Sequence, residues 1–406
     1  MICYVCQHSS VEMLLDFGSQ PLSNRFLSSP DQEEFLHPLL LGYCHSCGLI
    51  QLINPVSCEE AVPRFDWIRY QEPEGHLDRV AEILSQLPGV TSESTICGIS
   101  GQETSLLTRL RQKGFTHTWQ LSLGEDLGVH LDFANVETIQ KNVTLEKIEK
   151  VVKSRGRPNV VIARYILEHA HDPLQFMTAL QSMVQSDGYV VFEVPDVTTP
   201  LRACDYSILW EEHVFYFTPY SFIKCLEMGG FEVHSLDIYP YTMENSMVII
   251  ARIPDGNRQP SFLSRDGFLL EDESQRAFHY AKMLTERSSW YKEILSHYRQ
   301  ESKIALLGAG HLACHFINLL QLADLIDFVI DDHPNKSGMF MPGSKLPIFP
   351  STLLEERKIK VCLLSLSPES ERKVINHKKD FLARGGKFFS IFSTSDYALK
   401  SRELTN

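Results

Sequence analysis

Three ionisable side chains interrupt an apolar and aromatic run, ILWEEHVFYFT, at residues 208–218. They are Glu211, Glu212 and His213. An imidazole beside carboxylates is a set of groups that general-base catalysis uses, because histidine is largely neutral near physiological pH and a carboxylate can hold its ring in place. The same residues would also suit a solvated turn, with His213 as a structural histidine paired to a neighbouring carboxylate. Both interpretations stay open within this segment.

Two close cysteine pairs form a second constellation near the start of the chain. Cys3 and Cys6 share a C-x-x-C spacing with Cys44 and Cys47, and roughly 40 residues separate the two pairs. Two such knuckles bring four thiolates into the tetrahedral arrangement that zinc prefers, with no position left for water or substrate. The spacing therefore predicts a structural zinc ion. His45, within the second pair, is the alternative ligand to one of the cysteines.

The composition limits the classes of partner. The chain has 406 residues, of which 43% are hydrophobic, and a formal net charge of -13, so it can form two or three packed domains and has no excess of basic side chains for a phosphate backbone. No apolar run reaches the roughly 18 residues that span a bilayer. The other six cysteines are scattered, which favours unpaired thiols over disulfides. We therefore expect a cytoplasmic protein that binds neither nucleic acid nor membrane, and its oligomeric state is unknown.

An α/β fold has to position these side chains. From about residue 94 to 253, short β-branched runs alternate with amphipathic helical segments, which predicts a parallel, doubly wound sheet. The segment 268–300 predicts one long helix, and from residue 302 the alternation begins again in a second, smaller Rossmann-like α/β unit. The expected domains are a zinc-binding module at 1–75, a central α/β domain at 76–255, a helical linker at 256–300 and a C-terminal domain at 301–406.

The carboxyl ends of two central strands carry most of the remaining polar candidates. The run NVVIARYILEHAHDP ends a strand at Arg164 and continues to Glu168 and His169, and the run GYVVFEVPD reaches Glu193 near the end of the next strand. In open α/β sheets ligands bind beyond such strand ends, so both runs should face one crevice. A metal cluster of Glu168, His169 and His171 is the alternative to a role in a cofactor pocket or at a helix start.

Both runs are similar to the fourth and fifth strands of class I S-adenosylmethionine (SAM)-dependent methyltransferases. That resemblance implies a glycine-rich loop after the first strand, and ICGISGQETSLL supplies a looser form of it, with residues 102–104 facing the methionine part. Past the second strand, Glu125 and Asp126 would accept hydrogen bonds from a ribose diol, and a solvated helix start is the alternative. The residues expected around the methyl donor are Gly98, Ser100, Gly101, Glu125, Asp126, Arg164, Glu168 and His169.

The C-terminal run IALLGAGHLACHF contains a second glycine-bearing turn. Gly308 and Gly310 lie between a predicted strand and a predicted helix, and Asp331 and Asp332 follow roughly 20 residues later. This spacing suits a ribose contact in a dinucleotide site. A structural turn explains the glycine pair equally well, because the third glycine of the dinucleotide motif is absent. Nicotinamide-dependent redox chemistry in this domain is therefore the lowest ranked hypothesis.

Motifs from all of these zones, taken in order, resemble the sugar C-methyltransferase family, whose members methylate C-3 of a nucleotide-linked 4-ketohexose. The matching segments are CYVC, DFGSQPLSNRF and CHSCGLIQL, then ARYILEHAHDP, FEVPD and EEHVFYFTPYSF, and finally GAG and VIDDHPNKSGMFMPGSKLPI. The resemblance implies a zinc module, a class I methyltransferase domain and a second Rossmann-like α/β domain. It also implies SAM as methyl donor, structural zinc, and a nucleotide-sugar-like small molecule of deoxysugar biosynthesis as substrate.

The family's tyrosine-x-glutamate-histidine stretch matches the segment WEEH, which gives the interrupted run a role by resemblance. His213 would remove the acidic proton beside the sugar's ketone, Glu212 would orient its ring, and Tyr216 and Tyr70 would contact substrate oxygen. Trp210 stands where the family has a tyrosine, so one phenol is missing. A non-catalytic nucleotide- or partner-binding protein on the same scaffold is the rival hypothesis.

Overall fold

The computed structural model describes residues 1–68, 72–130, 135–254, 262–263, 268–356 and 359–399 of the chain. These residues form two compact units, each assembled from separate stretches of sequence. Among the described segments, no helix combines the length and the hydropathy that a membrane span requires. The first unit comprises Met1–Met13, Leu41–Val197 and Glu212–Gln275, and the second comprises Leu14–Leu40, Thr198–Glu211 and Arg276–Asn406.

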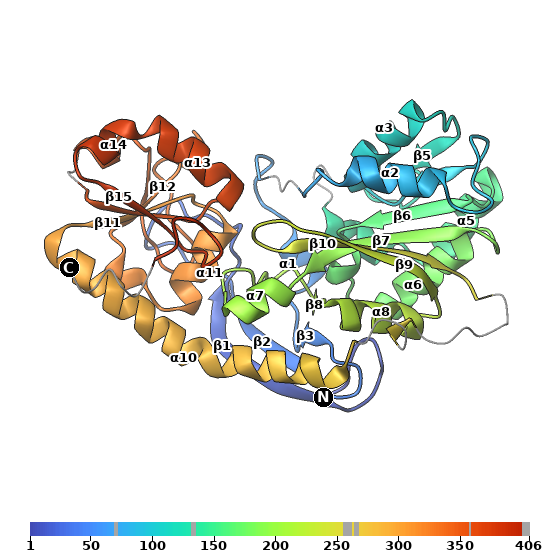
Figure 1. Ribbon diagram of the computed structural model, residues 1–406, viewed down its shortest axis with the longest axis horizontal. Helices are drawn as coiled ribbons and strands as arrows, with labels where there is room; N and C mark the ends of the chain where they lie inside the picture. The colour runs from blue at the N-terminus through green and yellow to red at the C-terminus, as the bar shows by residue number, and fades with distance from the viewer. Residues whose placement is uncertain (69–71, 131–134, 255–261, 264–267, 357–358, 400–406) are drawn as a thin grey trace. The chain divides into compact units, whose positions relative to one another are not determined.

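A six-stranded sheet forms the centre of the first unit, with the strand order β5-β4-β6-β7-β10-β9 (Figure 1). The first four of these strands are parallel, whereas β10 is antiparallel to both β7 and β9. The prediction of a fully parallel sheet is therefore wrong at this edge. The reason is the short connection between Tyr239 and Asn245, since a parallel crossover needs about a dozen residues or more. The strands are β4 Ile96–Gly98, β5 Thr118–Gln120, β6 Val160–Arg164, β7 Tyr189–Asp196, β9 Glu232–Tyr239 and β10 Asn245–Arg252.

Helices cover both faces of this sheet, because side chains of successive strand residues alternate between two apolar layers (Figure 1). Val160 and Ile162 of β6 pack in one layer with α2 and α3, and Val161 and Ala163 pack in the other with α5, α6 and α8. This arrangement confirms the predicted Rossmann-like α/β fold. The helices and 3₁₀ turns (η) are α1 Cys58–Ala61, α2 Leu77–Ser85, η1 Gly101–Glu103, α3 Thr104–Gln112, α4 Val136–Asn142, α5 Leu145–Arg155, η2 Leu167–His169, α6 Pro173–Met183 and α8 Pro219–Met228.

A separate sheet of order β1-β2-β3-β8 carries the cysteine-rich N-terminal segment. Its strand β3 pairs with both β2 and β8, and Ile50 of β3 lies opposite Tyr216 of β8. This pairing joins the cysteine-rich hairpin to the strand that follows His213. The boundary between the two units crosses β1 and β2. The strands are β1 Val11–Pro21, β2 Leu36–Cys44, β3 Ile50–Leu52 and β8 Phe215–Tyr216.

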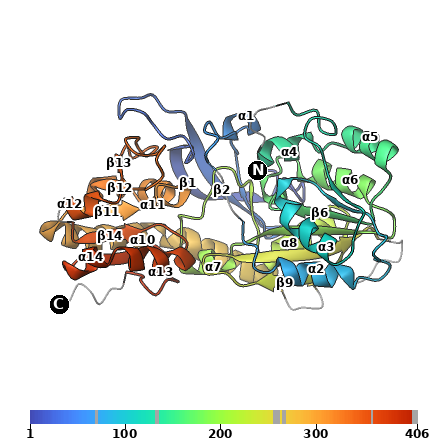
Figure 2. The same ribbon diagram turned by 90° about the horizontal axis from the view of Figure 1, so that it is seen from above.

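The second unit contains a five-stranded parallel sheet of order β13-β12-β11-β14-β15 (Figure 2). On one face Phe381 of α14 packs in an apolar cluster with Leu364 and Phe388, and on the other Tyr298 of α10 contacts Phe389. The predicted long helix is observed as α10, and the second Rossmann-like unit is confirmed. The elements are α7 Thr198–Ala203, α10 Leu270–Glu301, β11 Ile304–Leu307, α11 His311–Leu319, η3 Ala323–Leu325, β12 Phe328–Ile330, β13 Ile348–Phe349, α12 Leu353–Glu356, β14 Val361–Leu364, α13 Pro368–His377, α14 Lys379–Ala383 and β15 Lys387–Ser390.

The packing of α3 against the central sheet gives a first prediction. Leu107 is fully buried there, so Leu107→Ala should lower the free energy of unfolding by about 2–5 kcal/mol through lost apolar contacts and an unfilled cavity. Leu145, the first residue of α5, is 39% exposed, and Leu145→Ala should cost less than about 1 kcal/mol. Urea unfolding followed by circular dichroism measures both variants. Equal losses would contradict the assignment of Leu107 to the core.

Candidate functional site

Four thiols lie together at the start of the first unit, and they belong to Cys3, Cys6, Cys44 and Cys47. Their sulfur atoms lie within 4.8 Å of one another, and two of the Sγ to Sγ distances are 3.5 and 3.7 Å. All four residues are at most 7% exposed, and all four are free thiols. Sulfurs at this spacing fit a zinc ion bound at about 2.3 Å from each. The alternative ligand His45 lies outside the cluster, because its exposed ring pairs with Glu12, with 2.7 Å between Nε2 and Oε2.

The loop that follows β4 is braced from inside by its own glutamate. Glu103 is fully buried, and its carboxylate accepts hydrogen bonds from the backbone N–H of Ser100 at 2.6 Å and of Arg164 at 2.9 Å. Burial raises the pKa of Glu103 to about 7, although these backbone N–H groups act to lower it. The expectation that Glu103 faces a bound ligand is therefore wrong, because its carboxylate turns inwards to pair two buried backbone donors. Gly101, in contrast, borders open space, since no atom would lie within 4 Å of a Cβ added there.

A buried ionic network crosses the carboxyl edge of the sheet. Arg164, at the end of β6, is 1% exposed and pairs with Glu193 of β7, and its guanidinium also donates to the carbonyl of Gln102 at 2.7 Å. Glu193 accepts a hydrogen bond from the Ser246 hydroxyl at 2.7 Å and lies 2.9 Å from Nε2 of His76. Burial raises the pKa of Glu193, but His76 and Arg164 outweigh this and lower it. The guanidinium of Arg164 is thus engaged with the protein, where it holds the loop and two strands together.

A turn with an uncommon backbone conformation follows β6. Tyr165 has φ of 47°, in the left-handed region that bulky residues rarely adopt and that is often found at functional sites. In the η2 turn just beyond it, His169 packs edge-on against His213, with 4.6 Å between the ring centroids, and Glu137 lies 2.6 Å from Nδ1 of His169. Glu168 is 1% exposed, and neither of its carboxylate oxygens has a hydrogen-bond partner among the described residues.

Glu168, His169 and His213 each offer one nitrogen or oxygen atom, and these atoms lie within 4.8 Å of one another. We call this group the η2 cluster. Burial raises the pKa of Glu168 to about 8. Burial also acts to lower the pKa of His169, but Glu137 together with Glu168 and Glu72 outweighs it and the pKa is raised. His213 is half-buried, so the cluster is reached from solvent through this residue.

Other predicted contacts to the substrate lie near the cluster or outside the described residues. Glu212 is 5% exposed, and Tyr216 is 2% exposed with its ring centroid 6.3 Å from that of His213. Tyr70 lies outside the described residues. Glu72 adds a carboxylate whose charge interacts with that of His169, and desolvation raises the pKa of Glu72 to about 7.

Glu211 is engaged within the second unit. Its carboxylate accepts a hydrogen bond from the backbone N–H of Ser23 at 2.5 Å and lies 2.9 Å from Nε2 of His315. The two adjacent glutamates of the WEEH segment therefore serve different units, because the boundary between the units falls between Glu211 and Glu212.

The glycine pair of the second unit is packed as a structural turn. Asp331 accepts hydrogen bonds from the backbone N–H of Ala309 at 3.0 Å and from Nζ of Lys336 at 2.9 Å. Gly308 has φ of 107°, and a Cβ there would lie 2.9 Å from Oγ of Ser365. These contacts favour the structural turn over a dinucleotide site, since the oxygens expected to hold a ribose already brace the loop.

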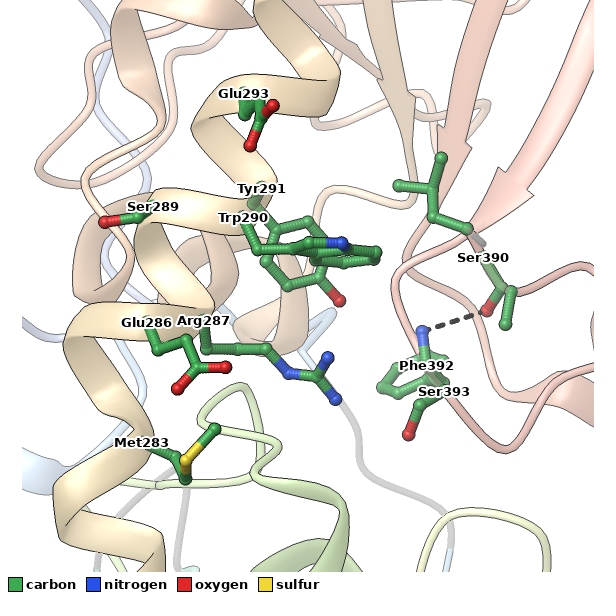
Figure 3. Close-up of a pocket in the computed structure, with 12 residues that line it drawn as sticks. Met283, Glu286, Arg287, Ser289, Trp290, Tyr291, Glu293, Ser390, Phe392 and Ser393 are labelled. Atoms are coloured by element: carbon green, nitrogen blue, oxygen red, sulfur yellow. Dashed lines mark hydrogen bonds between the residues drawn. The ribbon is translucent and has the colours of Figure 1, made fainter. Parts of the chain in front are cut away.

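A cavity of about 670 Å³ lies within the second unit, between α10 and the segment after β15 (Figure 3). Arg287, Trp290 and Tyr291 extend from α10 towards Ser390 and Phe392 in this view. None of the residues predicted for a site lines it. Some of the predicted site residues that are buried and ionisable lie in the η2 cluster, and none of them lies in this cavity.

Solved structures share a remote likeness with the chain. The 1,6-didemethyltoxoflavin-N1-methyltransferase of Burkholderia thailandensis aligns with a TM-score of 0.32 at 12% identity, covering 45% of this chain and 80% of that one. Magnesium protoporphyrin IX methyltransferase of Synechocystis PCC 6803 aligns with a TM-score of 0.27 at 15% identity, covering 44% and 78%. TM-scores this low do not identify a family, so sequence comparison is needed.

Sequence comparison matches all three parts of the chain. Residues 3–61 match the family described as "Putative zinc binding domain", residues 100–236 match "Methyltransferase domain", and residues 270–392 match "C-methyltransferase C-terminal domain". The C-methyltransferase NovU of Streptomyces niveus is 24% identical over 404 residues, which cover 95% of this chain and 94% of that protein. The chain therefore carries the regions matched by these three families in one order, and NovU resembles it over nearly its whole length. It is a SAM-dependent methyltransferase with a zinc-binding N-terminal module.

The residues of this C-methyltransferase fit both zinc and SAM. The four buried thiols provide a closed donor set for zinc. For SAM, the open side of Gly101 leaves room for a ligand at the β4 loop, and the polar cavity of about 530 Å³ that adjoins Gly101 and Gln102 is otherwise lined mainly by α3. Past β5, Glu125 is exposed and lies 3.9 Å from Arg155, which also holds Asp126 at 3.0 Å.

Sequence reasoning misses one residue of the C-methyltransferase site. Glu137 lies in the first turn of α4, after the N-cap residue Asn135. An acidic residue at this position is ordinarily explained by the helix dipole, so the sequence gives no signal that it pairs with His169. Only the tertiary fold brings α4 to η2.

The thiol cluster predicts the effect of removing one ligand. Cys47→Ala should lose one zinc ion per chain relative to the wild type, because three thiolates no longer close the coordination sphere. Cys58 is also buried but lies outside the cluster, so Cys58→Ala should keep its zinc. Elemental analysis of the purified variants measures this. Full zinc content in Cys47→Ala would contradict the four-thiolate site.

The buried carboxyl of Glu103 predicts a dependence of stability on pH. Its folded-state pKa of about 7 lies above the ordinary value of 4.5, so the folded chain binds this proton more tightly than the unfolded chain. The free energy of unfolding should therefore fall as pH rises from about 5 to 8, by about 1–3 kcal/mol. The groups that act on Glu103 are Arg164 and Cys97. Glu103→Gln should make this slope shallower in urea unfolding at matched pH values, because Glu72 and Glu168 keep their raised pKa values, and parallel slopes in the two proteins would refute the prediction.

Proposed function

We propose that this C-methyltransferase methylates a carbon next to a ketone, and that its acceptor is a nucleotide-linked keto-deoxysugar. The matched C-methyltransferase domain and the similarity to NovU support C-methylation, and the motif resemblance through nearly the whole chain supports the sugar acceptor. All ten cysteines are free thiols, which suits a reducing compartment such as the cytoplasm.

The observation that carries the proposal is the setting of His213. Its imidazole is half-buried beside His169 of the η2 cluster, so a small acceptor can approach it while most of its surroundings are protein. A histidine has the ordinary pKa that a base needs near neutral pH. Glu212 is the proposed orienter of the ring, and the other adjacent carboxylate, Glu211, is engaged with Ser23 and His315.

In the proposed reaction, His213 takes the proton from the carbon beside the ketone and becomes an imidazolium. The electron pair of that C–H bond delocalises onto the carbonyl oxygen as an enolate. SAM, when bound, supplies an electrophilic methyl group on a sulfonium centre. Transfer of that methyl group to the enolate carbon, with the sulfur keeping the electrons of the broken methyl–sulfur bond, would restore the ketone. His213 then returns its proton to solvent, to which it is partly exposed.

The other residues position the reactants. Tyr216, held on β8 opposite Ile50, is the proposed contact to substrate oxygen, together with Tyr70. The loop from Gly98 to Gly101 and the carboxylate of Glu125 are proposed to hold the donor. Holding donor and acceptor in line lowers the reaction barrier, because the entropy of bringing the two molecules together is lost on binding and not in the reaction step.

Replacing the base tests the proposal. His213→Ala should abolish methyl transfer to a nucleotide-linked 4-ketohexose, and should also abolish exchange of the hydrogen beside the ketone with deuterated solvent. Binding of SAM, measured by calorimetry, should be retained. His234 on β9 is exposed, and His234→Ala is the matched control with expected wild-type turnover. Retained hydrogen exchange in His213→Ala would end the assignment of this residue as the base.

A further inference from the structure

The buried carboxylate of Glu168 lacks the partners that such a group ordinarily has. It is 1% exposed, and nothing in the described part of the chain donates a hydrogen bond to either oxygen. A buried carboxyl without a hydrogen-bond donor is unfavourable, so folded proteins keep one where another group completes the pairing. The absence of a protein donor points to a ligand that carries positive charge or donates hydrogen bonds.

Two imidazoles define what that ligand is. One nitrogen each of His169 and His213 lies within 4.8 Å of the other and of a Glu168 oxygen. Metal ions of the zinc type bind such nitrogen and oxygen atoms at about 2.0–2.2 Å, which places neighbouring ligand atoms about 3.0–3.6 Å apart. Rotation of the half-buried His213 side chain can close the remaining gap. An ammonium ligand would gain little from two imidazoles, whereas a transition-metal ion binds them directly.

Glu137 gives His169 the arrangement of a metal-binding histidine. Its carboxylate is 1% exposed and lies 2.6 Å from Nδ1 of His169, which leaves Nε2 as the other ring nitrogen. Histidines that bind metals regularly pair their second ring nitrogen with a carboxylate, because the pair fixes the tautomer and the ring orientation. His171 was part of the metal cluster considered from sequence, but it is outside the group of side chains that converge here.

We propose that Glu168, His169 and His213 form a second metal site, which binds a divalent transition-metal ion, and that the bound ion inhibits methyl transfer. Two nitrogens and one oxygen suit zinc, cobalt or nickel rather than magnesium or calcium, which prefer oxygen ligands. The ion takes the nitrogen lone pair of His213, so this residue can no longer accept a proton. The metal site rests on the geometry of the η2 cluster, and the inhibition rests on the proposed function of His213.

Cobalt(II) titration of the full-length, zinc-containing protein tests the site. Zinc remains in the closed four-cysteine site, so any cobalt that binds measures the occupancy of the η2 cluster. We expect one cobalt ion per chain, with weak visible absorption and no sulfur-to-metal charge-transfer bands. Magnesium should not displace it. Glu168→Gln should weaken cobalt binding at least about tenfold, and Glu137→Gln should weaken it about 10–100-fold through the orientation of His169.

Matched controls separate loss of the ligand from loss of the fold. His171→Gln changes a neighbouring imidazole outside the cluster and should bind cobalt like the wild type. Glu168→Gln replaces a buried carboxyl that lacks a protein donor with a neutral amide of the same shape, so its thermal midpoint should equal or exceed that of the wild type. Cobalt should raise the midpoint of the wild type more than that of Glu168→Gln. Equal cobalt affinity in the wild type and Glu168→Gln, or no cobalt bound to the zinc-containing protein, would overturn the metal site.

Turnover separates this proposal from the proposed function. Methyl transfer by the wild type should fall in proportion to occupancy of the second site by zinc, and should recover when a chelator empties it. Full occupancy with unchanged turnover would overturn the inhibition and leave the binding result standing. Activity of His213→Ala would instead refute the base assignment, whatever the cobalt titration gives.

Discussion

The buried ion pair between Arg164 and Glu193 is the interaction on which the candidate site depends. It joins the carboxyl ends of β6 and β7, and through the carbonyl of Gln102 it also fixes the loop after β4. Removing one partner would leave a charge buried without compensation, a change that typically costs about 3–5 kcal/mol. The η2 turn begins at Leu167, three residues after Arg164, so the direction of Glu168 and His169 follows from how this pair holds the strand end.

The zinc module reaches the same site through strand pairing. Cys44 ends β2 and Cys47 lies in the connection to β3, where the next residue, Gly48, has φ of 72°, a conformation that suits glycine. Strand β3 then pairs with β8, which follows His213 by one residue. A structural metal that fixes this turn therefore also fixes the strand beside the proposed base. This gives the closed thiolate site a part in positioning, although its coordination leaves no position for substrate.

Features encoded over short separations could be predicted from the sequence, and partnerships between distant segments could not. The C-x-x-C pairs and the strand runs lie within a few residues of one another, so spacing and periodicity predict the thiol cluster and the Rossmann-like fold. The pairings of Glu137 with His169 and of Asp331 with the backbone N–H of Ala309 depend on the packing of separate elements. The inward turn of Glu103 depends on which backbone donors are buried, and the sequence carries no record of that.

The η2 cluster also shows why a site can be costly to the fold that holds it. Tyr165 adopts a left-handed backbone conformation, and Glu168 next to the cluster's histidines is buried without a protein donor. Each feature lowers the stability of the fold. A single substitution at each position could remove it if packing were the only requirement. Their occurrence within four residues, at the carboxyl end of a central strand, is the pattern expected where geometry is set by a ligand rather than by the core. The stability contributed by the two apolar layers offsets the cost of these two features.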